Sequence, residues 1–464
     1  MQIAYVCADY GVPVFGRKGC SIHVQEVIRA LLQQGHHVTL IAARLGGDPP
    51  ADLAQVPVHR LPAIPKQDRA QREQAELAIN LNLRFSLETA GPFDLVYERY
   101  SLWSFAAMEY GRDQAIPAVL EVNAPLIEEQ ARYRQLVYPQ KAQWVARRAF
   151  SAADALVAVS QGVADYLATF PETENCVYVI PNGVNVARFT DRFPRPHHPA
   201  SPPPHIPPFT VGFVGTMKTW HGLPTLMAAF RKLHDACPQA RLLMVGDGPA
   251  RLDCAAEMEQ HGLGAAVQWT GAVEPEQIPQ WLAQMDVAVA PYPPLEQFYF
   301  SPLKVYEYMA AGLPVIASDI GQLRQVITPG ETGLLVPPGD EEALVQALLQ
   351  LHRNPTLRQQ LGQQAQRQIA THHTWLQVVD RILNVAGPHP QPLSQEGEGS
   401  RKEISSDVRF VDGEVSACPH PQPLSQEGEG SQQGIVSGSK RSLPEKVQPQ
   451  ENPSKSLSHL GRGI

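Results

Sequence analysis

Charged residues are scarce in this sequence, and positive charge is scarcer than negative. Asp, Glu, Lys and Arg make up 18% of the chain, against about 25% in an ordinary globular protein. Lys and Arg number 38 and Asp and Glu number 46, so the formal net charge is −8. A protein that binds nucleic acid usually carries a basic excess, and nucleic acid is therefore not an expected partner.

Paired cysteines and long apolar runs are also lacking. The six cysteines are scattered, and no Cys-x-x-Cys pair indicates a zinc or redox site. No apolar run reaches the length of roughly 18 residues that a spanning helix needs. The first residues, 1–8, have the pattern of a strand and not of a signal peptide. We therefore expect a cytoplasmic protein with free thiols, no metal and no spanning helix.

Prolines mark the expected domain boundaries. Eight of the 43 prolines lie within 186–208, where no helix or central strand would tolerate them. This segment is predicted to be a Pro-rich linker between an N-terminal domain, 1–185, and a C-terminal domain, 209–387. Residues 388–464 are polar and contain a 13-residue segment twice, at 388–400 and 419–431. Their composition predicts a disordered tail with no packed core.

Short apolar runs alternate with amphipathic helical segments in both predicted domains. Strands that are apolar throughout, instead of at every second residue, are typical of parallel sheets covered on both faces. We therefore predict an α/β protein with two tandem Rossmann-like, doubly wound domains that face a central cleft. The strand candidates are 2–8, 37–43, 94–98, 117–122, 155–160 and 177–180 in the first domain, and 210–215, 240–246, 267–270, 286–290, 314–317 and 333–336 in the second.

The turn after the first strand is rich in glycine. Gly16 and Gly19 precede a helix near Ser21, and glycines there let backbone amides approach a ligand. The spacing of a dinucleotide fingerprint is absent, and so is a Gly-Lys-Ser/Thr phosphate loop. A nicotinamide oxidoreductase and a P-loop ATPase are therefore disfavoured, while a plain flexible connection stays an alternative for this turn.

Two glycine turns of the second domain could bind phosphate. Gly215 ends its first strand and Lys218 follows three residues later, while Gly246 ends the next strand. Glycine permits close approach of the backbone, and Lys218 could reach a phosphate in the cleft. A lysine after a strand is more often only solvated.

The run 299–319 is the most distinctive. Ser301 is predicted to cap a helix that has a proline in its first turn and ends at Gly312. The helix amino end, with Lys304, would face a diphosphate, and Glu307 could hold ribose hydroxyls. The alternative is an amphipathic helix with a chance Lys–Glu pair.

Several short motifs resemble those of the retaining glycosyltransferases of family 4, which have the two-domain fold called GT-B. The motifs occur in the family's order across about 1–387: Gly35-His36-His37-Val38-Thr39, Pro181-Asn182-Gly183-Val184-Asn185 with Phe189, Val245-Gly246-Asp247-Gly248-Pro249, Glu307-Tyr308-Met309-Ala310-Ala311-Gly312-Leu313-Pro314-Val315 and Gly333-Leu334-Leu335-Val336-Pro337.

The resemblance implies transfer of a sugar from a nucleotide-diphosphate donor to a glycan, lipid-linked or small-molecule acceptor, with retained anomeric configuration. It implies no metal and no other cofactor, because cationic side chains and a helix N-terminus neutralise the leaving diphosphate. The expected site has three groups of residues: catalytic Lys218, Lys304 and Glu307; donor-binding Gly215, Thr216, His221, Gly246, Ser301 and Leu303; and acceptor-side Gly16, Gly19 and Asn123.

The sequence departs from the family pattern at several of these positions. Thr216 and His221 stand where members commonly have Arg and Lys, and Tyr299 stands where they have a second Glu. Asn123 lies near the place of a frequent histidine. Lys218 and Lys304 are expected to supply the missing charge. A catalytically silent nucleotide-sugar-binding protein, or another GT-B enzyme such as an epimerase, is the alternative.

A predicted helix over 131–150 mixes cations with aromatic residues. Such a helix could place the protein at the inner face of a membrane, near a lipid-linked acceptor. The alternative, an ordinary helix with an exposed basic face, is favoured. Glu128 and Glu129, just before it, are candidates to touch the acceptor, although surface glutamates are usually solvated.

Overall fold

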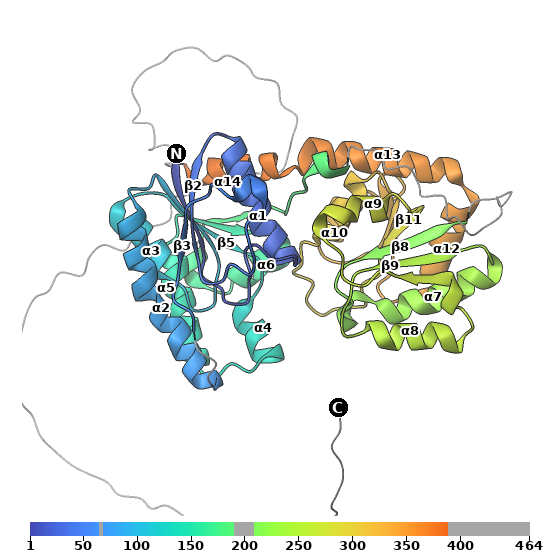
Figure 1. The fold of residues 1–464 in the computed structure, drawn as a ribbon, viewed down its shortest axis with the longest axis horizontal. Helices are drawn as coiled ribbons and strands as arrows, with labels where there is room; N and C mark the ends of the chain where they lie inside the picture. The colour runs from blue at the N-terminus through green and yellow to red at the C-terminus, as the bar shows by residue number, and fades with distance from the viewer. Residues whose placement is uncertain (65–67, 190–207, 388–464) are drawn as a thin grey trace, which may run out of the picture. The chain divides into compact units, whose positions relative to one another are not determined.

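The computed structural model describes residues 1–64, 68–189 and 208–387 (Figure 1). Most of the predicted linker and the whole predicted tail lie outside the described residues. The described residues contain two sheets in which every strand pairs in parallel with its neighbours. This confirms the predicted class of two doubly wound α/β domains.

The first sheet has seven strands in the order β3-β2-β1-β4-β5-β6-β7. The strands are β1 (Gln2–Cys7), β2 (His37–Ala42), β3 (Val58–Arg60), β4 (Leu95–Arg99), β5 (Ala118–Val122), β6 (Ala155–Ala158) and β7 (Val177–Val179). The helices between them are α1 (Gly19–Gln33), α2 (Arg69–Ala90), α3 (Ala106–Gln114), α4 (Leu126–Tyr133), α5 (Pro139–Ala152) and α6 (Gln161–Leu167), with short 3-10 turns η1 (Ala51–Leu53), η2 (Pro171–Thr173) and η3 (Val186–Phe189).

Both faces of the first sheet are buried, as its uninterrupted apolar strands require. Ala4 and Val6 pack into a core with helices α2, α3 and α5, while Ile3 and Tyr5, on the other face of β1, pack with α1. Successive side chains of a strand point to opposite faces, so a strand buried on both must be apolar throughout.

The second sheet has six strands in the order β10-β9-β8-β11-β12-β13. The strands are β8 (Thr210–Val214), β9 (Arg241–Val245), β10 (Val267–Trp269), β11 (Val287–Ala290), β12 (Val315–Ser318) and β13 (Gly333–Val336). The helices are α7 (Leu223–Ala236), α8 (Arg251–Gln260), α9 (Ile278–Leu282), α10 (Leu303–Ala310), α11 (Leu323–Val326), α12 (Glu341–Arg353), α13 (Pro355–His372) and α14 (Trp375–Ala386), with η4 (Thr219–His221), η5 (Gly264–Ala266) and η6 (Pro275–Gln277).

The last helix packs against the first sheet. The Trp375 ring lies 5.0 Å from that of His23 on α1, and the Gln34 side chain donates to Asp380 at 2.7 Å. Helix α14 lies beside α1 in Figure 1. The chain therefore leaves the second sheet at the end of α13 and finishes, as far as it is described, on the first.

Two local expectations are wrong. The helix expected over 131–150 is two helices, α4 and α5, because the chain breaks before Pro139 and proline opens a helix far better than it continues one. Two of its cations are also neutralised: Arg147 pairs with Glu172 at 2.6 Å and Arg148 with Glu109 at 2.6 Å. The second error concerns β3, a short edge strand without an apolar run, which is missing from the strand candidates.

In the part of the chain that the structure describes, no helix is both long and apolar enough to cross a membrane.

Candidate functional site

A cleft of about 560 Å³ is lined by residues that follow strands of both sheets. Ligand pockets of roughly 300–1,000 Å³ are typical of small-molecule sites, and the cleft has room for a nucleotide sugar. Ten of the twelve predicted site residues line it: Lys304, Glu307, Gly215, Thr216, His221, Gly246, Ser301, Leu303, Gly19 and Asn123.

Lys304 brings a cation to this cleft from the first turn of α10. Its ammonium lies 4.3 Å from the centroid of the Phe213 ring and 5.6 Å from that of Tyr292. The Nζ atom is buried and has no hydrogen-bond partner among the described residues. Burial lowers the pKa of Lys304 to about 7, and the charge of Glu307 opposes this change only in part. An unpartnered buried ammonium favours an anionic ligand beside it.

The glycine turns leave space for Lys304. Gly215 has a φ of +139°, and a Cβ there would lie 3.1 Å from Lys304 Nζ. Gly246 has a φ of +128°, and a Cβ there would lie 2.2 Å from the carbonyl oxygen of Gly215. Both positions have conformations that favour glycine. The two turns and the lysine therefore form one packed unit at the carboxyl ends of β8 and β9.

His221 is a neutral group in the cleft. Its Nδ1 lies 2.6 Å from the carbonyl oxygen of Thr216, so Nδ1 carries the proton and Nε2 is left as an acceptor. Burial first, and the charge of Lys304 second, lower the pKa of His221 to about 3. This histidine cannot replace a cation, and it can accept a hydrogen bond from a ligand hydroxyl.

Glu307 pairs with a residue that the sequence did not single out. The Arg188 guanidinium, on η3, lies 3.4 Å from its carboxylate, and both side chains are about four-fifths buried. Burial raises the pKa of Glu307, and Arg188 opposes that rise. The pair places a carboxylate one helical turn beyond Lys304, and Arg188 favours its charged form.

Ser301 does not cap α10 as expected. The residue in the cap position is Pro302, and no side chain caps the helix. Ser301 is instead bound to the first domain: its Oγ accepts the Asn182 backbone N–H at 3.2 Å, and its carbonyl accepts from the Asn182 side chain at 2.9 Å. The first N–H groups of α10 consequently have no side-chain cap, which suits an anion.

The first sheet contributes a polar floor to the cleft. His23 Nε2 lies 2.7 Å from the Glu121 carboxylate, and both side chains are 3% exposed. Arg99, at the end of β4, and Asn123, beyond β5, line the cleft, and each has a buried nitrogen without a partner among the described residues. Asn123 was predicted; the signal for Arg99 was its place at the carboxyl end of a strand.

Two predicted site residues lie elsewhere. Lys218 is not part of the cleft lining; its ammonium is 4.8 Å from the centroid of the Trp220 ring. Gly16 is also absent from the lining, and a Cβ there would meet Pro13 of its own loop and Ser21 in the first turn of α1. Its conformation therefore serves the turn before α1.

Tyr299 faces the first domain and is not part of the cleft lining. Its hydroxyl donates a hydrogen bond to the Glu129 carboxylate on α4, and its carbonyl accepts from the Ser160 hydroxyl at 2.6 Å. The Phe300–Leu303 segment, which does line the cleft, follows directly. Glu129 is thus engaged with the protein, whereas solvation was the expectation for it.

Comparison with known proteins identifies related families for both sheets. The family described as "Glycosyltransferase Family 4" matches residues 17–188, and "Glycosyl transferases group 1" matches residues 208–354. An alpha-maltose-1-phosphate synthase of Mycolicibacterium smegmatis is 26% identical over 421 residues, which are 83% of this chain and 98% of the relative. Other curated relatives are matched over only about half of their length.

Solved structures share the fold. A sucrose-phosphate synthase of Thermosynechococcus elongatus superposes with a TM-score of 0.63 at 22% identity, over 83% of this chain and 98% of the other. HepE of Anabaena, solved with UDP-glucose, superposes with a TM-score of 0.60 at 19% identity over the same shares. At such identities the likeness shows the fold alone.

Proposed function

We propose a function for this protein on the premise that it belongs to the group 1 glycosyltransferases of family 4. The proposal covers the class of the donor, the course of the reaction and the side of the cleft on which the acceptor binds. The protein transfers a sugar from a nucleotide-diphosphate sugar, with UDP-glucose the first donor to test, to a glycan or small-molecule acceptor. The configuration at the anomeric carbon is retained, no metal is required, and the reaction takes place in the cytoplasm.

The observation that carries this proposal is the unpartnered ammonium of Lys304. It lies beside the uncapped amino end of α10, where the helix dipole also favours negative charge. A diphosphate bound there would gain both interactions and would restore to Lys304 the charge that burial disfavours. HepE, which shares the fold, binds UDP-glucose.

The reaction follows from where charge develops. As the bond between the anomeric carbon and the β-phosphate oxygen breaks, negative charge grows on that oxygen beside Lys304. The same oxygen accepts the proton of the acceptor hydroxyl, whose oxygen then bonds to the anomeric carbon on the face that the phosphate left. Glu307, held by Arg188, accepts the ribose hydroxyls, and His221 Nε2 accepts a further donor hydroxyl.

The acceptor is expected on the side of the first sheet. Asn123 and Arg99 offer unused nitrogen atoms to the cleft from that side. These groups can orient an acceptor hydroxyl toward the anomeric carbon, and orientation of this kind supplies a large part of the rate in bimolecular transfers.

The test is UDP release by the full chain from UDP-glucose, with GDP- and ADP-sugars as comparisons, over a panel of acceptors. The anomeric configuration of the product is read by NMR. Acceptor-dependent release with retained configuration supports the proposal. Binding of the donor without release under any condition would identify a silent nucleotide-sugar-binding protein, and inverted configuration would refute the proposed course.

A further inference from the structure

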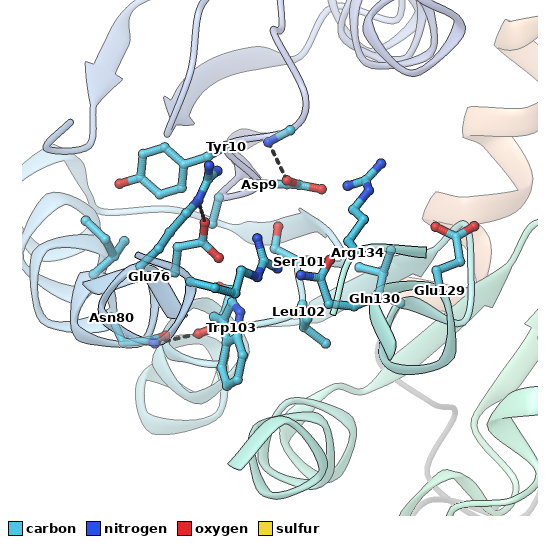
Figure 2. Close-up of a pocket in the computed structure, with 17 residues that line it drawn as sticks. Asp9, Tyr10, Glu76, Asn80, Ser101, Leu102, Trp103, Glu129, Gln130 and Arg134 are labelled. Atoms are coloured by element: carbon cyan, nitrogen blue, oxygen red, sulfur yellow. Dashed lines mark hydrogen bonds and ion pairs between the residues drawn. The ribbon is translucent and has the colours of Figure 1, made fainter. Parts of the chain in front are cut away.

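A cavity of about 90 Å³ in the first domain is lined by charged side chains that balance one another (Figure 2). Three arginines and three carboxylates line it: Arg69, Arg72, Arg134, Asp9, Glu76 and Glu129. This cavity therefore needs no ligand to complete its charge. The situation differs around Arg188, which contacts two residues of the cleft lining.

The Arg188 guanidinium joins two parts of the cleft. One of its NH₂ groups donates to the Glu307 carboxylate at 3.4 Å, and the other donates to the Pro275 carbonyl. Glu307 lies on α10, and Pro275 is the first residue of η6. A guanidinium presents its donors as a rigid planar fork. The two bonds therefore hold the carboxylate in a fixed position relative to η6.

A third neighbour of Arg188 belongs to the first domain. Glu26, on α1, is 4% exposed. Burial raises the pKa of Glu26, and the charges of Arg29 and Arg188 oppose this rise. The side chain of Asn185 is hydrogen-bonded to Glu26, and its carbonyl accepts the Arg188 N–H at 3.3 Å. The Glu26 carboxylate thus lies beside the turn that carries Arg188.

The Arg188 side chain is enclosed before any ligand binds. It is 20% exposed, and the side chain of Glu307 is 18% exposed. The guanidinium also lies 5.5 Å from the centroid of the Phe189 ring, and Phe189 is buried among residues of the second sheet. A carboxylate held by such a side chain is oriented in advance, so binding of a ligand need not order it.

The charge of Glu307 depends on Arg188. Burial raises the pKa of Glu307, Arg188 opposes the rise, and the negative charge of Glu26 adds to it. Without Arg188 the repulsion from Glu26 would remain, and the protonated form of Glu307 would be favoured. A protonated carboxyl group accepts hydrogen bonds from hydroxyls less strongly than a carboxylate does.

We infer that Arg188 is a positioning residue for ribose recognition, through which the site selects ribonucleotide sugars against 2′-deoxyribonucleotide sugars such as thymidine-diphosphate sugars. This inference rests on the proposed function, in which Glu307 accepts the ribose hydroxyls. Arg188 is not among the described residues that line the cleft. It acts through Glu307, which it keeps charged and oriented toward the 2′- and 3′-hydroxyls.

Calorimetric binding of UDP and of 2′-deoxy-UDP to the full chain tests the inference without turnover. The wild type should bind UDP about tenfold or more tightly than 2′-deoxy-UDP, as expected for a hydrogen bond to a charged group. In Arg188→Gln this preference should fall to about threefold or less, through weaker binding of UDP. Arg188→Lys should recover part of it, because an ammonium can pair with Glu307 but lacks the fork that also reaches Pro275. An Arg188→Gln variant that keeps the full preference would overturn the inference.

A double-mutant cycle shows whether Arg188 acts through Glu307. In a Glu307→Gln background, Arg188→Gln should change the UDP affinity by less than about twofold, because the group that it positions is already altered. Additive losses in the two variants would contradict the assignment.

Arg29→Gln is the matched control. Arg29 pairs with the same Glu26 at 3.0 Å, and it is not part of the cleft lining as far as the chain is described. We expect Arg29→Gln to keep the preference for UDP over 2′-deoxy-UDP. Equal losses in Arg29→Gln and Arg188→Gln would indicate a general effect of removing a cation beside Glu26, and would refute the role of Arg188 in ribose recognition.

The same titrations separate this inference from the proposed function. Tight binding of UDP together with equally tight binding of 2′-deoxy-UDP would leave the donor site standing and refute ribose selection. If the folded wild type bound none of UDP, GDP and ADP, both the proposed function and the inference would be overturned.

Discussion

Lys304→Met should stabilise the protein while it removes activity. The substitution keeps an unbranched apolar side chain of nearly the same length, and it removes the buried ammonium together with its contacts to the Phe213 and Tyr292 rings. A buried group that destabilises the ligand-free protein is retained when ligand binding or catalysis requires it. Removing the Lys304 ammonium is therefore expected to raise stability and lower activity.

The magnitude follows from the pKa of Lys304. Its fall from the ordinary 10.5 to about 7 corresponds to about 5 kcal/mol of destabilisation when the folded protein must bind the proton. Below pH 7 both folded and unfolded chains are protonated at this group, and the full cost applies. Between pH 7 and 10.5 only the unfolded chain binds the proton, so the wild type gains stability as pH rises. By pH 9 about 3 kcal/mol of the cost has gone.

Thermal unfolding of both proteins between pH 6 and pH 9 is the assay. Lys304→Met should be more stable than the wild type at pH 6 by up to about 5 kcal/mol, and this advantage should shrink as pH rises. Lys232→Met is the control, because its ammonium is on the surface beside Glu341 and Glu342. A destabilised Lys304→Met, or an advantage that does not change with pH, would refute the reasoning.

Donor binding provides an independent check of the same lysine. A diphosphate beside Lys304 raises the pKa of this lysine. Binding of UDP at pH 8 should therefore be accompanied by proton uptake at Lys304. Calorimetry in buffers of different ionisation enthalpy measures this uptake. We expect uptake in the wild type and none in Lys304→Met, and the variant should lose on the order of a hundredfold in kcat/KM.

Three further outcomes are expected. Glu307→Gln should lower kcat/KM for the donor about tenfold or more, since an amide accepts ribose hydroxyls less strongly than a carboxylate and the charge pair with Arg188 is lost; steady-state kinetics at saturating acceptor measures it. Tyr299→Phe should raise the acceptor KM severalfold with little change in UDP affinity, because only its bond to Glu129 is lost, whereas an unchanged acceptor KM would exclude coupling through this bond. Gly246→Ala should cost at least about 2 kcal/mol of unfolding free energy, because the new Cβ would clash with the Gly215 carbonyl in a left-handed conformation.

Much of the fold could be predicted because buried parallel strands are recognisable in sequence. Strand β8 has no polar residue after Thr210, and Gly215, where the expected cleft begins, follows it directly. Strand β3 could not be predicted in this way. It has three residues, two of them exposed, at the edge of the sheet, so the pattern that identifies a central strand was never required there.

The candidate site was predictable only where local sequence determines position. Gly246 directly follows strand β9 and Lys304 lies in the first turn of α10, so local turn and helix-start signals placed both at the cleft. The pairing of Arg188 with Glu307 joins residues 119 positions apart, and no local pattern encodes it. The displaced cap at Ser301 has the same cause, since a tertiary bond to Asn182 replaced the local one that cap propensity predicts.

The departures from the family pattern have one feature in common. His221 is bound to the Thr216 carbonyl, and Tyr299 is bound to Glu129, so at these positions the side chain serves the protein's own structure. Neither residue can carry positive charge to the cleft, and Lys218 lies against Trp220. Among the cleft residues that the second sheet contributes, the cationic part of the chemistry therefore falls on Lys304, whose Nζ is buried and has no hydrogen-bond partner among the described residues. If the diphosphate depends on this ammonium, the donor response should be lost with Lys304 alone, whereas cations from the first sheet's side, such as Arg99, would preserve it if they were interchangeable with Lys304.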